Sequence, residues 1–235
     1  MADSSQTVQL NFPLSSFEVK LRTHAHLGFF AYMVVMPLGI FIARYARTFT
    51  NSWFWPHAIV NFVITGPMVF ATFAMGYQVT TLGGEGHFVD PHQKMGLALL
   101  ILYIMQVLLG TFIHYVKFPA LRQGFPGGRL PQNYLHAILG LTIVLMGAWQ
   151  AHYGLWIEWG YVTGNGHPVG YQCKQFWTAI VVLFVLFYVA GLALLPRQFR
   201  QERAAAARQG GRDRGSKLND WVQKNWVPLQ DNGAL

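Results

Sequence analysis

Charged side chains are scarce in this chain, and they are missing altogether from long stretches of it. Charged residues make up 11% of the 235 residues and hydrophobic residues 53%, whereas about 25% of the residues of a soluble domain are charged. No Asp, Glu, Lys or Arg occurs in residues 23–43, 48–84, 95–116, 130–157 and 175–196. A bilayer core needs about 20 apolar residues per helix. The sequence therefore predicts five membrane-spanning helices and excludes a soluble enzyme and a disordered chain.

Cysteine is nearly absent as well. Cys173 is the only one, so an internal disulfide, and with it a disulfide-stapled secreted domain, is excluded. The net charge is +8. The segment 197–235 holds eight basic and four acidic residues, so half of the net positive charge lies there. In a membrane protein, basic residues placed in this way indicate orientation and lipid contact rather than nucleic-acid binding.

The predicted fold is an all-α, multi-pass membrane helical bundle of five transmembrane helices. The predicted spans are residues 24–45, 56–82, 91–116, 131–157 and 174–195. They divide the chain into a short outer N-terminal segment (1–22), a transmembrane domain (23–196) and a basic tail (197–235). Two interpretations of the tail stay open: a disordered, solvated segment, or one that lies on the membrane surface through Trp221 and Trp226.

The basic residues also predict the orientation. With five spans the two ends of the chain lie on opposite sides of the membrane. Four of the 17 basic residues fall on the side of the N-terminus and thirteen on the other side. By the positive-inside rule the N-terminus is predicted to be outside or luminal and the C-terminus cytoplasmic. The organelle stays open.

Four of the nine histidines lie at the start of a predicted span, and ionisable groups at membrane depth are functional hypotheses by default. The four are His24, His57, His92 and His136. Since odd and even spans run in opposite directions, His24 and His92 share the outer level, and His57 and His136 share the inner level. A lone histidine is more often a core group or a proton relay. Two pairs of histidines, each pair at one level of the membrane, favour a role as metal ligands.

Two neutral imidazoles that face each other across a helical bundle are the ligand set of a six-coordinate haem iron. His92 is followed by Gly96 and His136 by Gly140, one turn further along the same face, where a small residue lets a flat ring approach the backbone. The sequence therefore predicts a four-helix core with two b haems per chain. Haems with two axial histidines have no free coordination position, which argues for electron transfer. No separate catalytic side chain is predicted.

The same spans carry short motifs at fixed spacings. In chain order these are His24-Ala25 with Pro37-x-Gly39 and Ala43-Arg44-Tyr45, then Trp53-Phe54-x-x-His57, then His92-x-x-x-Gly96 with Gln106, and finally Asn133-x-x-His136-x-x-x-Gly140 with Gln150-x-x-x-Gly154. Over residues 22–195 this order resembles the cytochrome b561 family, in the form that elsewhere is fused to an outer DOMON domain. A DOMON domain is not expected here, since only 23 residues precede His24. Asn61 and Gln150 stand where the family more often has Gln and Asn.

The resemblance implies a ligand set and a reaction. The implied axial ligands are His24 with His92 and His57 with His136. The implied donor is cytoplasmic ascorbate, and the acceptor is an outer ferric chelate, monodehydroascorbate or a redox protein. The chain would thus be a transmembrane ascorbate-dependent oxidoreductase. Arg44, Arg47 and Arg122, on the inner side, are predicted to attract the ascorbate monoanion, and Arg44 also matches the family's Ala-Arg-Tyr.

The roles of the other five histidines stay open. His26 is the rival of His24, but the two point about 200° apart on a helix, and the family spacing to Pro37 selects His24. His114 and His152 are interpreted as interfacial groups, either of which could replace a ligand. His87 and His167 are expected to be solvated in outer links, where ferric or cupric ions could reach them.

Two other functions stay open besides transmembrane electron transfer. A haem-anchoring subunit of a larger oxidoreductase would share the histidine pairs. A histidine-relay transporter would be expected to carry carboxylates in mid-membrane, and the predicted spans have none. The lipid bilayer is a predicted partner, and the oligomeric state, a homodimer included, stays open.

Overall fold

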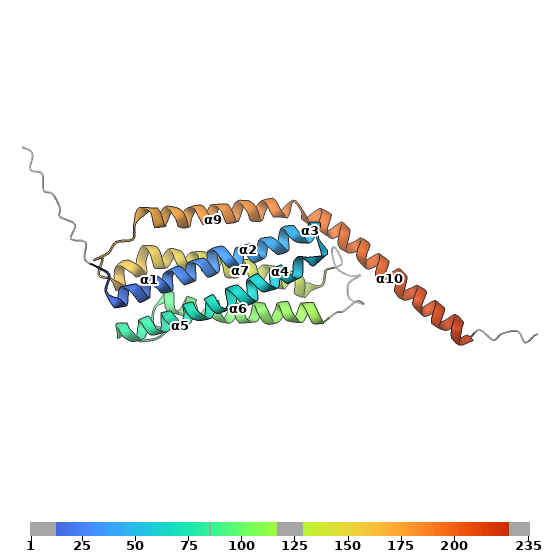
Figure 1. Ribbon diagram of the computed structural model, residues 1–235, viewed down its shortest axis with the longest axis horizontal. Coiled ribbons are helices and arrows are strands. Elements are labelled where there is room, and N and C mark those ends of the chain that lie inside the picture. Colours follow the sequence, from blue (N-terminus) through green and yellow to red (C-terminus); the bar gives the residue numbers. More distant parts are fainter. Residues whose placement is uncertain (1–12, 85, 117–128, 226–235) are drawn as a thin grey trace, which may run out of the picture.

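The computed structural model describes residues 13–84, 86–116 and 129–225. These residues form an all-α bundle, which confirms the predicted fold class. Five long helical segments run back and forth along one axis (Figure 1) and are long and apolar enough to cross a membrane. Their bounds are Ser16–Phe49, Asn51–Gly83, Pro91–Tyr115, Pro131–Val162 and Tyr171–Leu192. The first segment begins earlier than predicted, because Ser15 and Glu18 form a capping box there.

The first two segments alternate between α-helical and more loosely wound turns. The first consists of α1 (Ser16–Phe29), the π-helical η1 (Phe30–Val35), α2 (Met36–Phe41), the π-helical η2 (Ile42–Ala46) and α3 (Arg47–Phe49). The second consists of the 3₁₀ turn η3 (Asn51–Trp53), α4 (Phe54–Ala58), the π-helical η4 (Ile59–Ile64) and α5 (Thr65–Gly83). Pro37 lies in α2, directly after η1. A proline lacks the N–H that continues the α-helical pattern, so irregular turns near it are expected.

The remaining segments are more regular. They comprise α6 (Pro91–Tyr115), α7 (Pro131–Tyr153) with the π-helical η7 (Gly154–Glu158) and α8 (Trp159–Val162), α9 (Tyr171–Leu192) and α10 (Leu195–Asn225). Proline occupies the first turn of α6 and of α7, where its missing N–H removes no helical hydrogen bond. The Asp90 side chain caps α6 by accepting a hydrogen bond from the backbone N–H of Gln93 at 3.0 Å.

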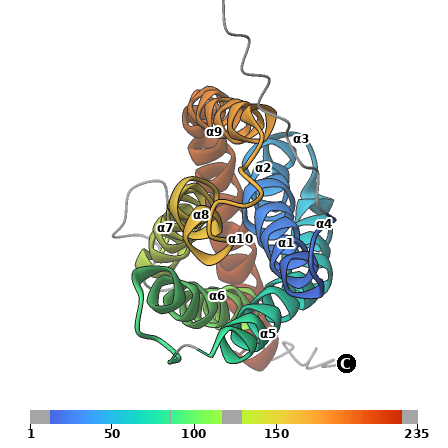
Figure 2. The same cartoon turned by 90° about the vertical axis from the view of Figure 1, so that its left-hand side faces the viewer.

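The first four segments form a ring, and the fifth packs outside it. α1 pairs with α5 and α6 pairs with α7, while α7 also contacts η1 and α5 contacts α6. Seen end-on, α9 lies outside this ring against α2 and α7 (Figure 2). The first and third segments are therefore diagonal partners, as are the second and fourth. Fully buried side chains fill the middle of the ring: Val69, Leu99, Ile143 and Val144.

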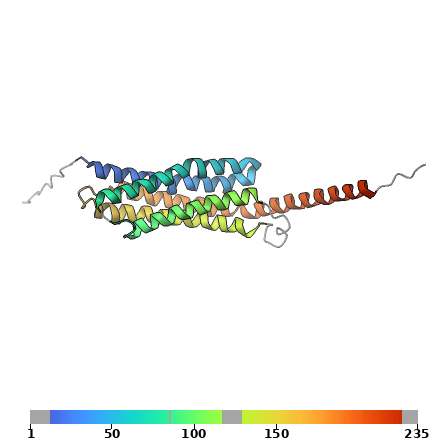
Figure 3. The same ribbon diagram turned by 90° about the horizontal axis from the view of Figure 1, so that it is seen from below.

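The segment predicted as a separate tail is a helix. α10 starts before residue 197 and projects beyond the bundle (Figures 1 and 3). Its first turns pack on the bundle, since Gln198 is only 3% exposed, while most of the rest is exposed. The interpretation of this segment as disordered is therefore wrong for residues 197–225. Trp221 is exposed on α10, and Trp226 lies outside the described residues.

Candidate functional site

The first candidate site lies at one end of the bundle, called here the His24 end. His24 on α1 and His92 on α6 face each other across the ring, with ring centres 6.1 Å apart and planes at 68°. Nδ1 of His24 lies 2.8 Å from the backbone oxygen of Thr72. A carbonyl oxygen only accepts hydrogen bonds, so this nitrogen carries the proton and Nε2 keeps its lone pair for a metal.

The second candidate site, at the opposite His57 end, has the same construction. His57 on α4 and His136 on α7 have ring centres 6.3 Å apart and planes at 72°. Nδ1 of His57 donates to the backbone oxygen of Gly39 at 2.8 Å. The structure thus brings together both predicted pairs, first with third and second with fourth. At 1.5 Å per residue, α6 rises about 27 Å between His92 and Gly110, which packs against His136, so the pairs lie near opposite faces of a bilayer core about 30 Å thick.

Glutamines from the neighbouring helix hold the other two histidines. Gln150 on α7 donates its amide N–H to the backbone oxygen of His92 at 2.8 Å. Gln106 on α6 donates in the same way to the backbone oxygen of His136 at 2.9 Å. α6 and α7 therefore exchange equivalent contacts, one at each end of the bundle.

Glycines let three of the rings lie directly against a neighbouring backbone. A Cβ added at Gly76 or at Gly110 would lie 2.9 Å from Cε1 of His24 or of His136. A Cβ added at Gly154 would lie 3.4 Å from Cε1 of His92. Distances below 3.0 Å are not tolerated without movement, so a side chain at the first two positions would displace the ring.

Gly96 and Gly140, which are predicted to let a haem ring approach the backbone, also adjoin two glutamines. Each faces the amide of a neighbouring glutamine, with an added Cβ 3.6 Å from Nε2 of Gln150 and 2.8 Å from Nε2 of Gln106, respectively. They make room for the glutamines that hold the histidines. Two further sequence patterns belong to the surroundings of the histidines: Gly28 repeats the His-x-x-x-Gly spacing after His24, and Gln106-x-x-x-Gly110 repeats Gln150-x-x-x-Gly154.

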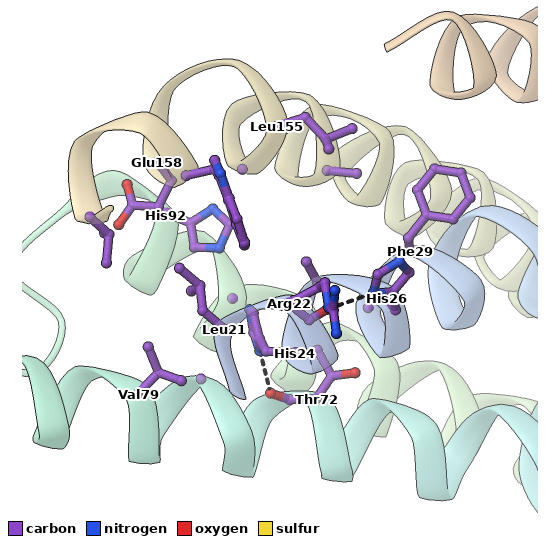
Figure 4. Close-up of a pocket in the computed structure, with 18 of the residues that line it drawn as sticks. Leu21, Arg22, His24, His26, Phe29, Thr72, Val79, His92, Leu155 and Glu158 are labelled. Atoms are coloured by element: carbon purple, nitrogen blue, oxygen red, sulfur yellow. Dashed lines mark hydrogen bonds between the residues drawn. The ribbon is translucent and has the colours of Figure 1, made fainter. Parts of the chain in front are cut away.

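A cavity of about 1490 Å³ opens at the His24 end and reaches both rings of that pair. Figure 4 shows His24 and His92 pointing toward each other in it, with Thr72 behind His24. Small-molecule sites typically enclose about 300–1,000 Å³, so the space is large enough for a bulky planar group. Lys20, Arg22 and other polar residues also line it.

The chemistry of each pair fits haem. No family model, curated protein or solved structure matches this chain. The fit therefore rests on geometry: two imidazoles bound to one metal at about 2 Å each have ring centres roughly 6 Å apart. Each pair supplies two imidazoles, whereas a bare zinc ion takes three or four protein ligands. Haem iron, with four nitrogens from its own macrocycle, needs two axial ligands.

The remaining histidines have other contacts. His26 is exposed, and its Nδ1 lies 2.8 Å from the backbone oxygen of Arg22. His87 stacks on Tyr77, His114 on Phe54 and His152 on Trp156, with ring centres 3.8, 3.7 and 4.3 Å apart. His167, which the sequence predicts to be solvated, is half-buried, and its Nδ1 lies 2.7 Å from a carboxylate oxygen of Glu18.

The positive charge predicted on the inner side is partly neutralised at the His57 end. Arg47 forms an ion pair with Glu202 of α10, and Arg129 also pairs with Glu202, at 2.7 Å. This acid comes from α10 and not from the links between the predicted spans, so the sequence pattern did not indicate it. Arg44 stacks over the ring of Tyr188 and donates to its hydroxyl at 3.2 Å. Arg122 lies outside the described residues.

Proposed function

We propose that this chain transfers electrons across a membrane by means of two b haems, one held by His24 and His92 and the other by His57 and His136. Each bound haem supplies a one-electron carrier. The observation that carries the proposal is the geometry of the two histidine pairs: diagonal helices, ring centres 6.1 and 6.3 Å apart, and opposite ends of one bundle. This arrangement suits passage of an electron from one face to the other better than it suits chemistry at a single face.

The donor is cytoplasmic ascorbate, and the His57 end is the cytoplasmic end. Support comes from the basic residues of that end, among them Arg44, whose guanidinium contacts the ring and the hydroxyl of Tyr188. A positive field at this end draws in the ascorbate monoanion. The acceptor is a ferric chelate, monodehydroascorbate or a redox protein outside, and the chain is thus an ascorbate-dependent oxidoreductase of the cytochrome b561 type.

The test is the haem content and reducibility of the purified chain. A pyridine haemochrome assay against protein mass should approach two haems per chain, and ascorbate should produce sharp b-type bands in a reduced-minus-oxidised spectrum. His92→Ala should reduce the content to about one, because the other pair stays intact. The control His26→Ala removes an exposed histidine two residues from His24 and should leave two.

The outcome also separates the competing functions. A chain without haem contradicts the proposal and favours the alternative in which the histidines relay protons in a transporter. Haem bands that ascorbate does not reduce favour a haem-anchoring subunit that receives electrons from a bound protein. The exposed length of α10 is the feature that favours this second candidate, because it offers a partner a surface outside the membrane bundle.

A further inference from the structure

The four histidines differ in what surrounds the ring nitrogen that would not bind iron. Nδ1 of His24 and Nδ1 of His57 each have a backbone carbonyl partner at 2.8 Å. Nδ1 of His92 and Nδ1 of His136 are buried without a hydrogen-bond partner among the described residues. Each pair therefore contains one histidine fixed by the backbone and one whose Nδ1 partner is missing.

The two glutamines that hold these histidines also have a buried atom without a hydrogen-bond partner among the described residues. Oε1 of Gln106 and Oε1 of Gln150 are also buried without a partner in the described part of the chain, although the amide nitrogens of both residues are bonded to histidine backbone oxygens. Nε2 of Gln106 also lies 3.4 Å from Nε2 of His136, and iron bound at that nitrogen would replace this contact. In each pair, the glutamine that holds the backbone of the histidine therefore also has a buried oxygen without a partner among the described residues.

The chemistry of an axial ligand determines which atoms must pair. When iron takes Nε2 of a neutral imidazole, Nδ1 carries the proton and becomes a donor. A buried donor without an acceptor costs about 1–3 kcal/mol. The unpaired Oε1 of the neighbouring glutamine is an acceptor that can remove this cost.

We propose that Gln150 and Gln106 are positioning residues for the axial ligands His92 and His136. Each accepts the Nδ1–H of its histidine through Oε1 while its amide nitrogen holds the backbone of the same residue. Each haem site then combines a histidine fixed by a backbone carbonyl with a histidine fixed by a glutamine. The inference rests on the proposed function, because it concerns the ligands of the haems proposed there.

A hydrogen bond from Nδ1–H makes an imidazole a stronger donor to the metal and fixes its ring, and loss of such partners typically lowers metal affinity about 10- to 100-fold. A stronger donor stabilises ferric over ferrous iron. Gln150→Leu should therefore raise the midpoint potential of one haem and increase its dissociation about tenfold or more. Gln106→Leu should do the same to the other haem.

The experiment is a redox titration with electron paramagnetic resonance spectra of the ferric low-spin signals, on the full-length haem-loaded protein. Gln78→Leu is the matched control, since Gln78 is exposed on α5, and it should change neither potential nor signal. Gln150→Glu keeps an acceptor oxygen in either protonation state, so it should retain both haems without a positive shift.

The test depends on whether each Leu variant changes one haem only, and a different haem in each case. Leu variants that leave both potentials and both signals at their wild-type values, or that shift the same haem, overturn the proposal. If Gln150→Leu does not assemble, Gln150→Glu decides alone, and a positive shift or loss of one haem in that variant overturns the proposal. Failure of the proposed function shows itself differently, as a wild-type chain that binds no haem.

Discussion

At the scale of single residues, absent side chains matter as much as present ones. The rings of His24 and His136 lie against Gly76 and Gly110, at distances that leave no space for a Cβ. In a helix interior, glycine is normally less stable than alanine by roughly 0.5–1 kcal/mol. At these positions that cost is offset, because the bare backbone lets the ring turn toward its partner across the bundle.

Gly76→Ala should therefore disturb one site selectively. The added methyl meets Cε1 of His24 at 2.9 Å and turns the ring away from His92, so the haem content should fall from about two to about one. Gly83→Ala is the control in the same helix, because its Cβ would approach only Phe17, at 4.0 Å. Haemochrome assays of the two variants give the comparison, and equal haem content in both would contradict the role assigned to Gly76.

At the scale of elements, α10 is divided into two parts with different roles. Near its start, Gln198 donates to the backbone oxygen of Arg44 and to Oγ1 of Thr48, both at 2.7 Å. Glu202, one turn later, pairs with Arg47 and Arg129. Beyond these turns, the described side chains are almost all exposed. The beginning of α10 therefore belongs to the bundle, although its composition resembles the rest of the tail.

Two truncations should separate these parts. A chain that ends after Arg208 keeps the contacts of Gln198 and Glu202 and should unfold like the full chain. A chain that ends after Pro196 loses buried hydrogen bonds worth about 1 kcal/mol each and partly exposed ion pairs worth about 0–1 kcal/mol each, so its stability should be lower by about 2–3 kcal/mol. Thermal unfolding in one detergent measures the difference. Equal melting of the two truncated chains would show that α10 does not stabilise the bundle.

At the scale of the whole molecule, diagonal pairing gives the bundle two separate ends. One histidine pair lies at each end, and a tightly packed core that includes Leu99 and Ile143 fills the ring between them. The cavity at the His24 end reaches only one pair. If the proposed function holds, damage to one pair should affect exchange with one side of the membrane only.

Sealed vesicles test this separation, with ascorbate trapped at the His57 end and an impermeant ferric chelate at the other. His92→Ala should still be reduced rapidly by ascorbate, but should reduce the chelate at least about tenfold more slowly. His136→Ala should lose rapid reduction by ascorbate first. Cys173, exposed near the His24 end, reports orientation through its reaction with an impermeant maleimide. Loss of ascorbate reduction in His92→Ala but not in His136→Ala would contradict the assigned sides.

The bundle and its histidine pairs could be predicted from residue order alone. Charge-free stretches of about 20 residues determine where helices cross a membrane, and alternating direction determines which histidines share a level. Residue order alone therefore pairs His24 with His92, and His57 with His136. The role of these residues as haem ligands stays a prediction.

The contacts around the histidines were decided only by the tertiary structure. The spacing of Gly96 and Gly140 predicts contact with a haem ring, which stays a prediction, but it does not indicate that these glycines also face Gln150 and Gln106. Likewise, no local pattern placed Glu202 against Arg47. Sequence spacing shows which residues share a face of one helix. The rotation of each helix about its axis, set by packing against its neighbours, determines what that face meets.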